Sequence, residues 1–276
     1  MSPSSPLDSL VRGQPARGFG AAWLARVVVH SAGLHMKSQR TAWYTIVGVL
    51  VMPIAYLSVM RYLAGDRGLR WSQVIGSGMA GTWSSLFFYA RGALLYDRWY
   101  GNLEPLLAAP APLWAVMLGR VAAGALVGLL SLGTSVAAAL LMGVSHAVAL
   151  GWLVGSVIVF FFACLSLGLV IAVVYVVAPL PNGLTNAFQA GGLLLSGILF
   201  PVERLPEALR WLSAALPVSW AARLMAAADP SAGMEPARWW SCAGIALLVS
   251  ALALVAAAWL YGLADRRLRR RGDSYG

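Results

Sequence analysis

Long apolar runs, separated by short polar links, make up most of the chain after its first forty residues. Each run is long enough to cross about 30 Å of hydrocarbon as a helix that rises about 1.5 Å per residue, and the fifth run is the shortest. The pattern therefore predicts an all-α integral membrane protein with six transmembrane helices. The predicted spans cover about residues 42–63, 71–96, 113–143, 148–177, 184–200 and 240–263.

The chain before the first span has a different pattern. Residues 1–20 are rich in Ser, Pro, Gly and Arg and predict a flexible cytoplasmic tail, which leaves residues 21–276 as a single transmembrane domain. If residues 21–40 form a helix, their basic side chains fall within an arc of about 80°, and apolar side chains cover much of the remainder. This favours an N-terminal amphipathic helix on the membrane surface, with a basic extension of the first span as the alternative. The basic residues in the arc are Arg26, His30, Lys37 and Arg40.

Composition supports the same class of protein. Hydrophobic residues make up 60% of the chain and charged residues 11%, whereas soluble domains carry about 25% charged residues. The basic residues behind the net charge of +10 lie mostly in the tails and short connections, so we expect no nucleic-acid partner. Cys164 and Cys242 lie in separate apolar runs and predict neither a disulfide nor a metal site.

Charge asymmetry predicts how the chain is oriented. Basic residues cluster before the first span and again at residues 266–271, and six spans place both ends on one side. Because cytoplasmic segments of membrane proteins carry an excess of basic residues, we expect both termini in the cytoplasm and the protein in the inner (cytoplasmic) membrane. Arginines that would face outward depart from this rule, and acidic neighbours balance the later ones. These arginines are Arg61, Arg67, Arg70, Arg204, Arg210, Arg223 and Arg238.

Small residues recur within the predicted spans. Gly124 and Gly128 form one G-x-x-x-G pair, and Gly151 and Gly155 form another. Such residues let helix backbones approach closely in lipid, where no hydrophobic drive brings helices together. The pattern favours a tightly packed bundle.

The link between the second and third predicted spans has the pattern of a short amphipathic helix in the cytoplasm. Gly101 would end the preceding helix, Asn102 can cap a new one, and Pro110 ends it. Glu104 lies in its first turn, beside the positive end of the helix dipole. Leu103, Leu106 and Leu107 form one apolar stripe, at i, i+3, i+4 spacing. Such a helix suits docking into a groove on a soluble partner, although a plain connecting helix on the bilayer fits the spacing equally well.

This link also resembles the signature of type-2 ABC transporter permeases, the drug and polysaccharide export class. The signature reads approximately E-x-x-x-G-T-L-E-x-L-L-x-T-P. Asn102 and Ala109 stand where the family often has Thr, and Asp97 replaces Glu. The resemblance implies that the segment is the coupling helix, which transmits movement of an ATPase to the membrane. The matching positions are Asp97, Gly101, Leu103, Glu104, Leu106, Leu107 and Pro110.

A second group of signals follows the fifth predicted span. Residues 196–217 are punctuated by prolines, too short to cross the bilayer, and extracellular in the predicted topology. Because lipid tolerates broken backbone only where protein or water covers it, we interpret them as a re-entrant or interfacial helix pair, with an ordinary surface helix as the alternative. The S-G, F-P, L-P and L-P pairs are similar to the second signature of the same family. They place Ser196, Gly197, Pro201, Pro206 and Pro217 in this segment.

The sequence pattern offers no catalytic chemistry. It contains no G-x-x-x-x-G-K-[ST] phosphate loop, since the sole lysine, Lys37, follows Met36. No acidic residue lies in mid-span, and His30, His35 and His146 lie outside the spans, so catalytic groups would not converge in the membrane. We expect a transport subunit with no catalytic residue, cofactor or metal of its own. As the resemblance implies, ATP and Mg²⁺ would be bound by a separate ABC ATPase subunit.

The expected function is ATP-driven export, whose direction comes from the resemblance. The cargo would be hydrophobic or amphiphilic: a drug, an antibiotic, a lipid or a lipid-linked glycan. Because one six-span bundle lacks a second face to close a pathway, we expect a homodimer, or a heterodimer with a related permease, within membrane lipid. Asn186 and Gln189 are candidates to line the pathway or to hydrogen-bond between helices. The alternative is an ion-coupled carrier or a structural membrane subunit.

Overall fold

The computed structural model of the chain is helical throughout the part that it describes. It describes residues 20–39, 43–65, 68–99, 101, 106, 111–144, 149–177, 181–227, 229 and 233–272. The all-α fold class predicted from the sequence is confirmed for these residues. In chain order the helices are α2 (Ala21–Gln39), α3 (Trp43–Ile46), the π-helical turn η1 (Val47–Val51), α4 (Met52–Ala64), α5 (Trp71–Trp99), α7 (Leu113–Leu141), α8 (Leu150–Val177), α9 (Asn182–Leu195), the 3₁₀ turn η3 (Val202–Arg204), α10 (Glu207–Ala214), α11 (Pro217–Ala226) and α12 (Pro236–Gly272).

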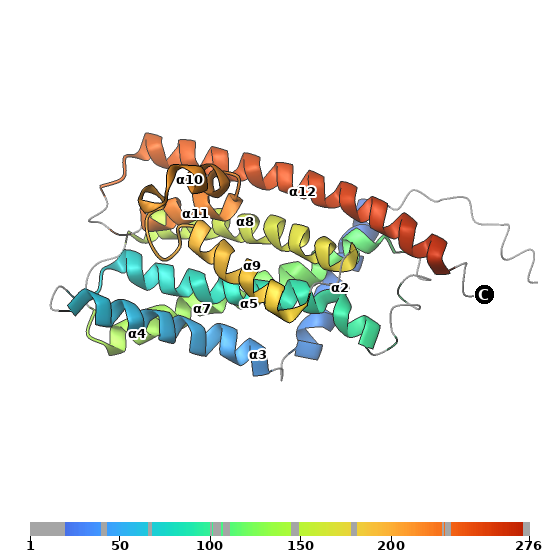
Figure 1. Ribbon diagram of the computed structural model, residues 1–276, viewed down its shortest axis with the longest axis horizontal. Coiled ribbons are helices and arrows are strands. Elements are labelled where there is room, and N and C mark those ends of the chain that lie inside the picture. Colours follow the sequence, from blue (N-terminus) through green and yellow to red (C-terminus); the bar gives the residue numbers. More distant parts are fainter. Residues whose placement is uncertain are drawn as a thin grey trace, which may run out of the picture.

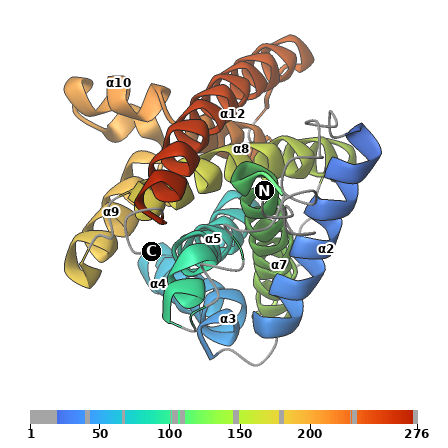
Figure 2. The same ribbon diagram turned by 90° about the vertical axis from the view of Figure 1, so that its right-hand side faces the viewer.

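The long helices form a bundle whose two ends differ. Figure 1 shows most of them running along one axis, with α10 and α11 gathered at the end where α12 begins. We call this the α11 end. The opposite end, where α5 finishes, α7 begins and α12 ends, is called the C-terminal end. Seen along the axis in Figure 2, α5 lies among the other helices, α2 lies outside α7, and α9 and α10 stand at one edge.

Helix α5 is enclosed by protein over much of its length. Every residue of α5 from 74 to 87 is buried. Its glycines let α7 approach closely, since a Cβ on Gly78 would lie 2.7 Å from the Cα of Leu132. Thr82 also donates a hydrogen bond from its Oγ1 to the carbonyl oxygen of Gly128, at 2.9 Å. The predicted close packing at the first G-x-x-x-G pair is therefore confirmed.

The second G-x-x-x-G pair is used only in part. A Cβ on Gly155 would lie 3.0 Å from the Trp239 ring of α12, whereas one on Gly151 would meet nothing within 4 Å. Trp239 also donates a hydrogen bond from its indole nitrogen to the Ser156 hydroxyl, at 3.1 Å. The contact of α8 with α12 is therefore built around a tryptophan rather than on two glycines.

Within the described part of the chain, four helical segments are long and apolar enough to cross a membrane: residues 47–64, 113–141, 150–177 and 236–265. The predicted spans at 113–143 and 148–177 agree with α7 and α8 to within two residues. Helix α5 has 29 residues but is less apolar than these four segments. Its glycines and serines contact protein rather than lipid, so the helix needs less apolar surface. Helix α12 begins four residues before the predicted sixth span and extends beyond its end.

The predicted end of the fifth span was wrong. Helix α9 ends at Leu195, and residues 196–200 form turns rather than the last turns of a helix. Its 14 residues rise about 21 Å, less than the thickness of the hydrocarbon layer. The physical reason lies in Gly197, whose φ of +71° cannot continue a right-handed helix.

Helix α2 forms where the amphipathic helix was predicted, and it packs along α7. The Ser31 hydroxyl donates a hydrogen bond to the carbonyl oxygen of Val116, at 2.8 Å. The basic residues predicted for one arc, Arg26, His30 and Lys37, are exposed. However, apolar Val29 (70% exposed) is exposed as well. One face of α2 therefore belongs to the bundle, and the rest of its surface mixes basic and apolar side chains.

Candidate functional site

The predicted coupling segment begins in the last turns of α5, at the C-terminal end of the bundle (Figure 1). Helix α5 runs through Asp97 to Trp99, and Gly101 follows in a turn with a φ of +70°, as expected for a glycine that ends a helix. Leu106 is helical and half-buried against the main apolar core, so this member of the predicted stripe contacts the bundle. Pro112 then precedes α7. The side chain of Asp97 and all of Leu103, Glu104, Leu107 and Pro110 lie outside the described residues, and their roles stay predictions.

A buried histidine joins three helices at the same end. His35 of α2 is 7% exposed, and its ring meets the Tyr89 ring of α5 edge-on, with centroids 5.4 Å apart. The Tyr89 hydroxyl lies 3.2 Å from Oγ1 of Thr45 in α3, within hydrogen-bond distance. Burial, and then the positive charge of Arg120, lower the pKa of His35 to about 4. The imidazole is therefore neutral near pH 7.

At the α11 end, Ser196 and Gly197 turn the chain after α9. The Ser196 amide donates to the carbonyl oxygen of Gly192 (2.9 Å), and its hydroxyl donates to that of Leu193 (2.7 Å). Gly197 adopts a positive φ, and a Cβ there would lie 2.4 Å from Cγ2 of Val202. These two positions of the second predicted signature thus set where α9 ends and how η3 folds back.

The turn after Gly197 packs directly on α5. A Cβ on Gly76 would lie 2.6 Å from the carbonyl oxygen of Ile198. The glycine therefore lets the backbone of the turn touch the backbone of α5. This contact holds the segment against the bundle, which a free surface loop would not require.

The prolines of the second signature begin three short elements. Pro201 precedes η3, Pro206 precedes α10, and Pro217 is the first residue of α11. Side-chain hydrogen bonds tie these elements together: Arg210 donates from Nε to the carbonyl oxygen of Leu205 (2.8 Å). Where a helix pair was predicted over residues 196–217, the segment thus holds a 3₁₀ turn and one α-helix, α10, and α11 begins at its last residue.

Helix α11 itself was not foreseen. It is packed against α8, α12 and α5, and most of its residues are buried. Its signal in the sequence is a proline at the first helical position, followed by apolar residues at helical spacing. These buried residues are Val218, Ala221, Ala222, Leu224 and Met225.

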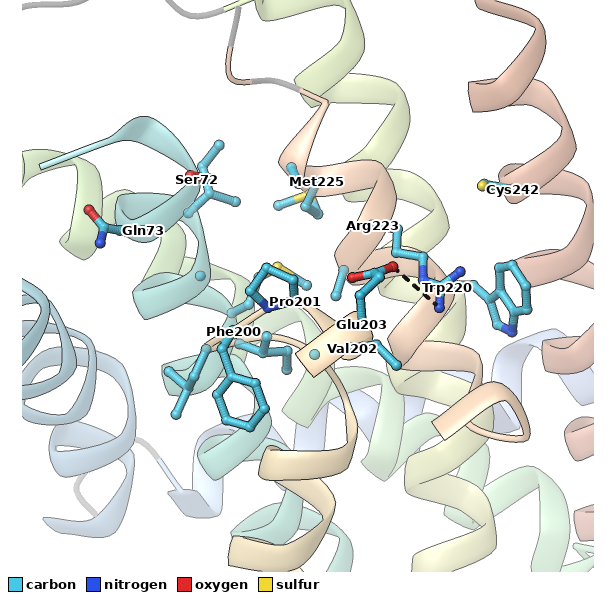
Figure 3. Close-up of a pocket in the computed structure, with 18 of the residues that line it drawn as sticks. Ser72, Gln73, Phe200, Pro201, Val202, Glu203, Trp220, Arg223, Met225 and Cys242 are labelled. Carbon is cyan, nitrogen blue, oxygen red and sulfur yellow. Dashed lines mark ion pairs between the residues drawn. The ribbon is translucent and has the colours of Figure 1, made fainter. Parts of the chain in front are cut away.

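A cavity of about 960 Å³, which we call the α11 cavity, lies at this end. It is lined by residues of α4, α5, α11 and α12 and by the chain from Gly197 to Arg204. Figure 3 shows Phe200, Pro201 and Val202 on one side of the pocket and Arg223 and Trp220 on the other. Segments far apart in the sequence therefore meet around one space.

Four arginines line the α11 cavity: Arg70, Arg204, Arg223 and Arg238. We call them the arginine rim. Arg223 lies 3.9 Å from the carboxylate of Glu203, as the dashed line in Figure 3 marks, and its guanidinium carbon lies 4.7 Å from the centre of the Trp220 ring. Among the described residues, no group of three His, Cys, Asp or Glu side chains is placed to hold a metal ion.

The two predicted pathway residues lie on α9, away from this lining. Asn186 is exposed and Gln189 is half-buried, and neither lines the α11 cavity. The backbone carbonyl of Gln189 accepts a hydrogen bond from the Trp83 indole nitrogen at 3.0 Å, which ties α9 to α5. The predicted pathway role of both side chains stays a prediction.

The described start of the first signature, in the last turns of α5, and the second signature thus lie at opposite ends of one helical bundle. The family model of the ABC-2 type transporter matches residues 29–228, which is more than half of the chain. The chain belongs to this family. No individual curated protein matches it.

The ABC-2 match begins within α2 and ends just after α11, and α12 lies beyond it. The match therefore includes both signatures and the turn after Gly197 that lines the α11 cavity. The resemblance found in the sequence is therefore confirmed, and the protein is a transmembrane permease of the ABC transporter class. Its membrane-crossing helices make it a multi-pass membrane protein.

Proposed function

We propose that the chain is the transmembrane subunit of an ATP-driven exporter that moves a hydrophobic or amphiphilic cargo across the cytoplasmic membrane. The observation that supports this proposal is an ABC-2 domain in which α5 carries the start of one signature to one end of the bundle, while the second signature lies at the other end. The two signatures need to lie at opposite ends of the bundle, because one would contact an ATPase in the cytoplasm and the other would close the outer end.

Energy for transport would come from another chain. Permeases of the ABC-2 family normally work with an ABC ATPase subunit, and this sequence has no phosphate loop. We propose that the ATPase, which would bind ATP and Mg²⁺, docks on the link that contains Glu104. The permease would contribute no catalytic group.

The membrane arrangement that we propose has six crossings with both termini in the cytoplasm. Four segments have the length and composition to cross. Helix α5 would cross as a protein-enclosed helix, which needs less apolar surface. Helix α9 and the turn after Gly197 would complete the fifth crossing, with α10 and α11 at the outer face. Helix α2, with its exposed basic side chains, would lie along the cytoplasmic surface.

A second copy, or a related permease, would complete the pathway. Exposed apolar side chains on α9 and α12, among them Phe188 (57% exposed) and Leu252 (62% exposed), support a partner or lipid on this edge of the bundle. Because α9 is too short to cross the bilayer alone, we place the second subunit beside it.

Charge reversal at Glu104 tests the proposal. The permease is purified from its own host together with any nucleotide-binding protein that co-purifies, and the complex is reconstituted in liposomes. We expect Glu104→Arg to lower cargo-stimulated ATP turnover and transport at least tenfold, because the carboxylate would meet the ATPase. Glu235→Arg is the matched control, since Glu235 is exposed and precedes α12 at the α11 end.

The outcomes separate the candidate functions. Co-purification of a stoichiometric ATPase, together with loss of coupling in the Glu104 variant only, supports the exporter. If no nucleotide-binding subunit co-purifies, an ion-coupled carrier or a structural subunit replaces it. If the Glu104 variant assembles and transports normally, the coupling role of this link is wrong.

A further inference from the structure

The arginine rim runs against the usual distribution of charge in membrane proteins. Basic residues concentrate on the cytoplasmic side, and in the proposed topology the α11 end faces outward. All four rim arginines nevertheless line one cavity there. Orientation does not account for them, so their charge points to something that they bind.

Positive charge at the rim is only partly balanced. Among the described residues, four guanidinium groups and one carboxylate, that of Glu203, line the cavity, which leaves a net charge of +3 from this part of the chain. Glu203 is 67% exposed and lies 3.9 Å from Arg223, and such exposed pairs are weak. Among the described residues, Arg70, Arg204 and Arg238 form no ion pair.

One further carboxylate lies close to the cavity. Asp229 is buried and accepts a hydrogen bond at 3.2 Å from the backbone amide of Ser72, which lines the cavity. Counting it as well still leaves a net charge of +2. The rim therefore presents an excess of positive charge on either count.

The guanidinium of Arg223 is held in place by its neighbours and keeps a hydrogen-bond donor that no described group uses. The ring of Trp220 supports its guanidinium at 4.7 Å, and Glu203 lies to one side. Its Nε is buried and has no hydrogen-bond partner. A fixed guanidinium fork matches the paired oxygens of a phosphate or carboxylate, so this position is prepared for an anion.

Much of the remaining cavity lining is apolar. Side chains from α5, α11, α12 and the turn after Gly197 contribute, and the volume of about 960 Å³ is within the range of small-molecule pockets. Methionines among them can adapt to a flexible hydrocarbon chain. The apolar lining includes Ile75, Met79, Phe200, Met225 and Ile245.

We propose that the α11 cavity binds an amphiphilic cargo whose headgroup carries a phosphate. The arginine rim would bind the phosphate, and the apolar lining would contact the hydrocarbon chain. This inference rests on the proposed export function and narrows its cargo from any hydrophobic or amphiphilic molecule to an anionic one.

Binding is tested on the full chain in nanodiscs of phosphatidylcholine. Dodecyl phosphate is compared with dodecyl maltoside, which has the same chain and no charge, and with inorganic phosphate, which has the charge and no chain. We expect dodecyl phosphate to bind at least tenfold more tightly than either. Equal binding of the maltoside would reduce the site to an apolar pocket, and equal binding of inorganic phosphate would reduce it to an anion site. Either result overturns the proposal.

Substitutions locate the site. We expect Arg204→Gln, Arg223→Gln and Arg238→Gln each to weaken binding of dodecyl phosphate about tenfold, the size of one lost charge-assisted hydrogen bond. Arg61→Gln is the matched control, because Arg61 is an exposed arginine at the same end that does not line the cavity. Arg223→Lys keeps the positive charge and tests whether the two-pronged guanidinium group is needed. The thermal unfolding temperature without ligand shows that each variant is folded. An equal loss in the Arg61 variant would make the effect a general one of charge and overturn the site.

The complex with the ATPase distinguishes cargo from a resident lipid. If the ligand is cargo, dodecyl phosphate stimulates ATP turnover, and Arg204→Gln raises the concentration needed about tenfold. Binding without any stimulation would identify a bound lipid and overturn the cargo assignment. Because binding to the permease alone needs no ATPase, failure of the ATPase to co-purify would overturn the export function and leave the binding result readable.

Discussion

Glycines in this chain have different roles that depend on their surroundings. Gly191 lies within α9, where a Cβ would meet nothing within 4 Å. Gly197 lies two residues beyond the end of α9, has a φ of +71°, and would place a Cβ 2.4 Å from Val202. The same residue type is therefore replaceable at one position and required at the other.

Alanine at these two glycines should change stability in opposite directions. Gly197→Ala should destabilise the protein by about 2 kcal/mol or more, because a left-handed conformation costs about 1–2 kcal/mol for an L-residue and the new methyl group meets Val202. Gly191→Ala should leave stability unchanged or raise it by up to about 1 kcal/mol, because alanine favours helix. Thermal unfolding in an uncharged detergent measures both. Equal unfolding temperatures would show that the turn after α9 is not set by Gly197.

At the scale of elements, short helices depend on a few side-chain contacts. Helix α2 is joined to α7 by the Ser31 hydrogen bond and to α5 by the His35 and Tyr89 rings. Helix α9 is joined to α5 through the Trp83 indole. In contrast, α5 and α7 pack along their whole buried faces, so the peripheral helices are the places where a single side chain has a large effect.

Attachment of α2 should weaken in acid because of His35. The pKa of His35 is about 4 in the folded protein, below its usual 6.5. Burial of His35 favours its neutral form only when α2 is docked. The contribution of docked His35 to the free energy of unfolding is therefore complete above pH 6.5 and is lost as the pH falls toward 4. At pH 5 the loss is about 2 kcal/mol.

Thermal unfolding between pH 7.5 and pH 4.5 measures this effect. His35→Gln, which cannot be protonated, should remove the part of the pH dependence that belongs to α2. His30→Gln is the control, since His30 is exposed on the same helix. A pH profile that is identical in wild type and His35→Gln would show that His35 does not sense pH.

At the scale of the whole molecule, the two ends of the bundle carry different chemistry. The C-terminal end has the link from α5 to α7 and the exposed basic side chains of α2. The α11 end has the proline-rich segment and the α11 cavity. The proposed export function would use this difference, with one end meeting an ATPase and the other releasing cargo.

Cysteine labelling in intact cells tests the orientation. In a background with Cys164→Ala and Cys242→Ala, a membrane-impermeant maleimide should label Trp211→Cys, because Trp211 is 77% exposed on α10. It should not label Lys37→Cys on α2 until the cells are opened. Labelling of Lys37→Cys but not of Trp211→Cys in intact cells would show that the orientation is opposite to the one proposed. Labelling of both positions would show that the reagent had crossed the membrane.

Much of the fold was predictable because lipid imposes simple rules on a sequence. Long apolar runs located α7, α8 and the first and last spans, and Gly101 marked where α5 ends, whereas the end of α9 at Leu195 was not predicted. The family also followed from two short signatures. Helix α11 was missed, since ten residues leave too short a pattern to separate from a loop.

The candidate site was predictable only as a list of residues. Ser196, Gly197 and Pro201 belong to one local segment, which the sequence placed outside the membrane as a re-entrant or interfacial helix pair. Arg70 just before α5, Arg223 in α11 and Arg238 in α12 come from segments that no local pattern joins. Their shared cavity depends on contacts between distant segments.

The sequence by itself determined the helical class, the approximate spans and the ABC-2 family, because each follows from local hydrophobicity or a short motif. Only the tertiary structure decided that α5 is enclosed, that α9 stops at Leu195, and that four arginines surround one cavity. The physical reason is that hydrophobic spacing specifies which surface of a helix is apolar, whereas the neighbour that covers it is set by packing across the whole bundle.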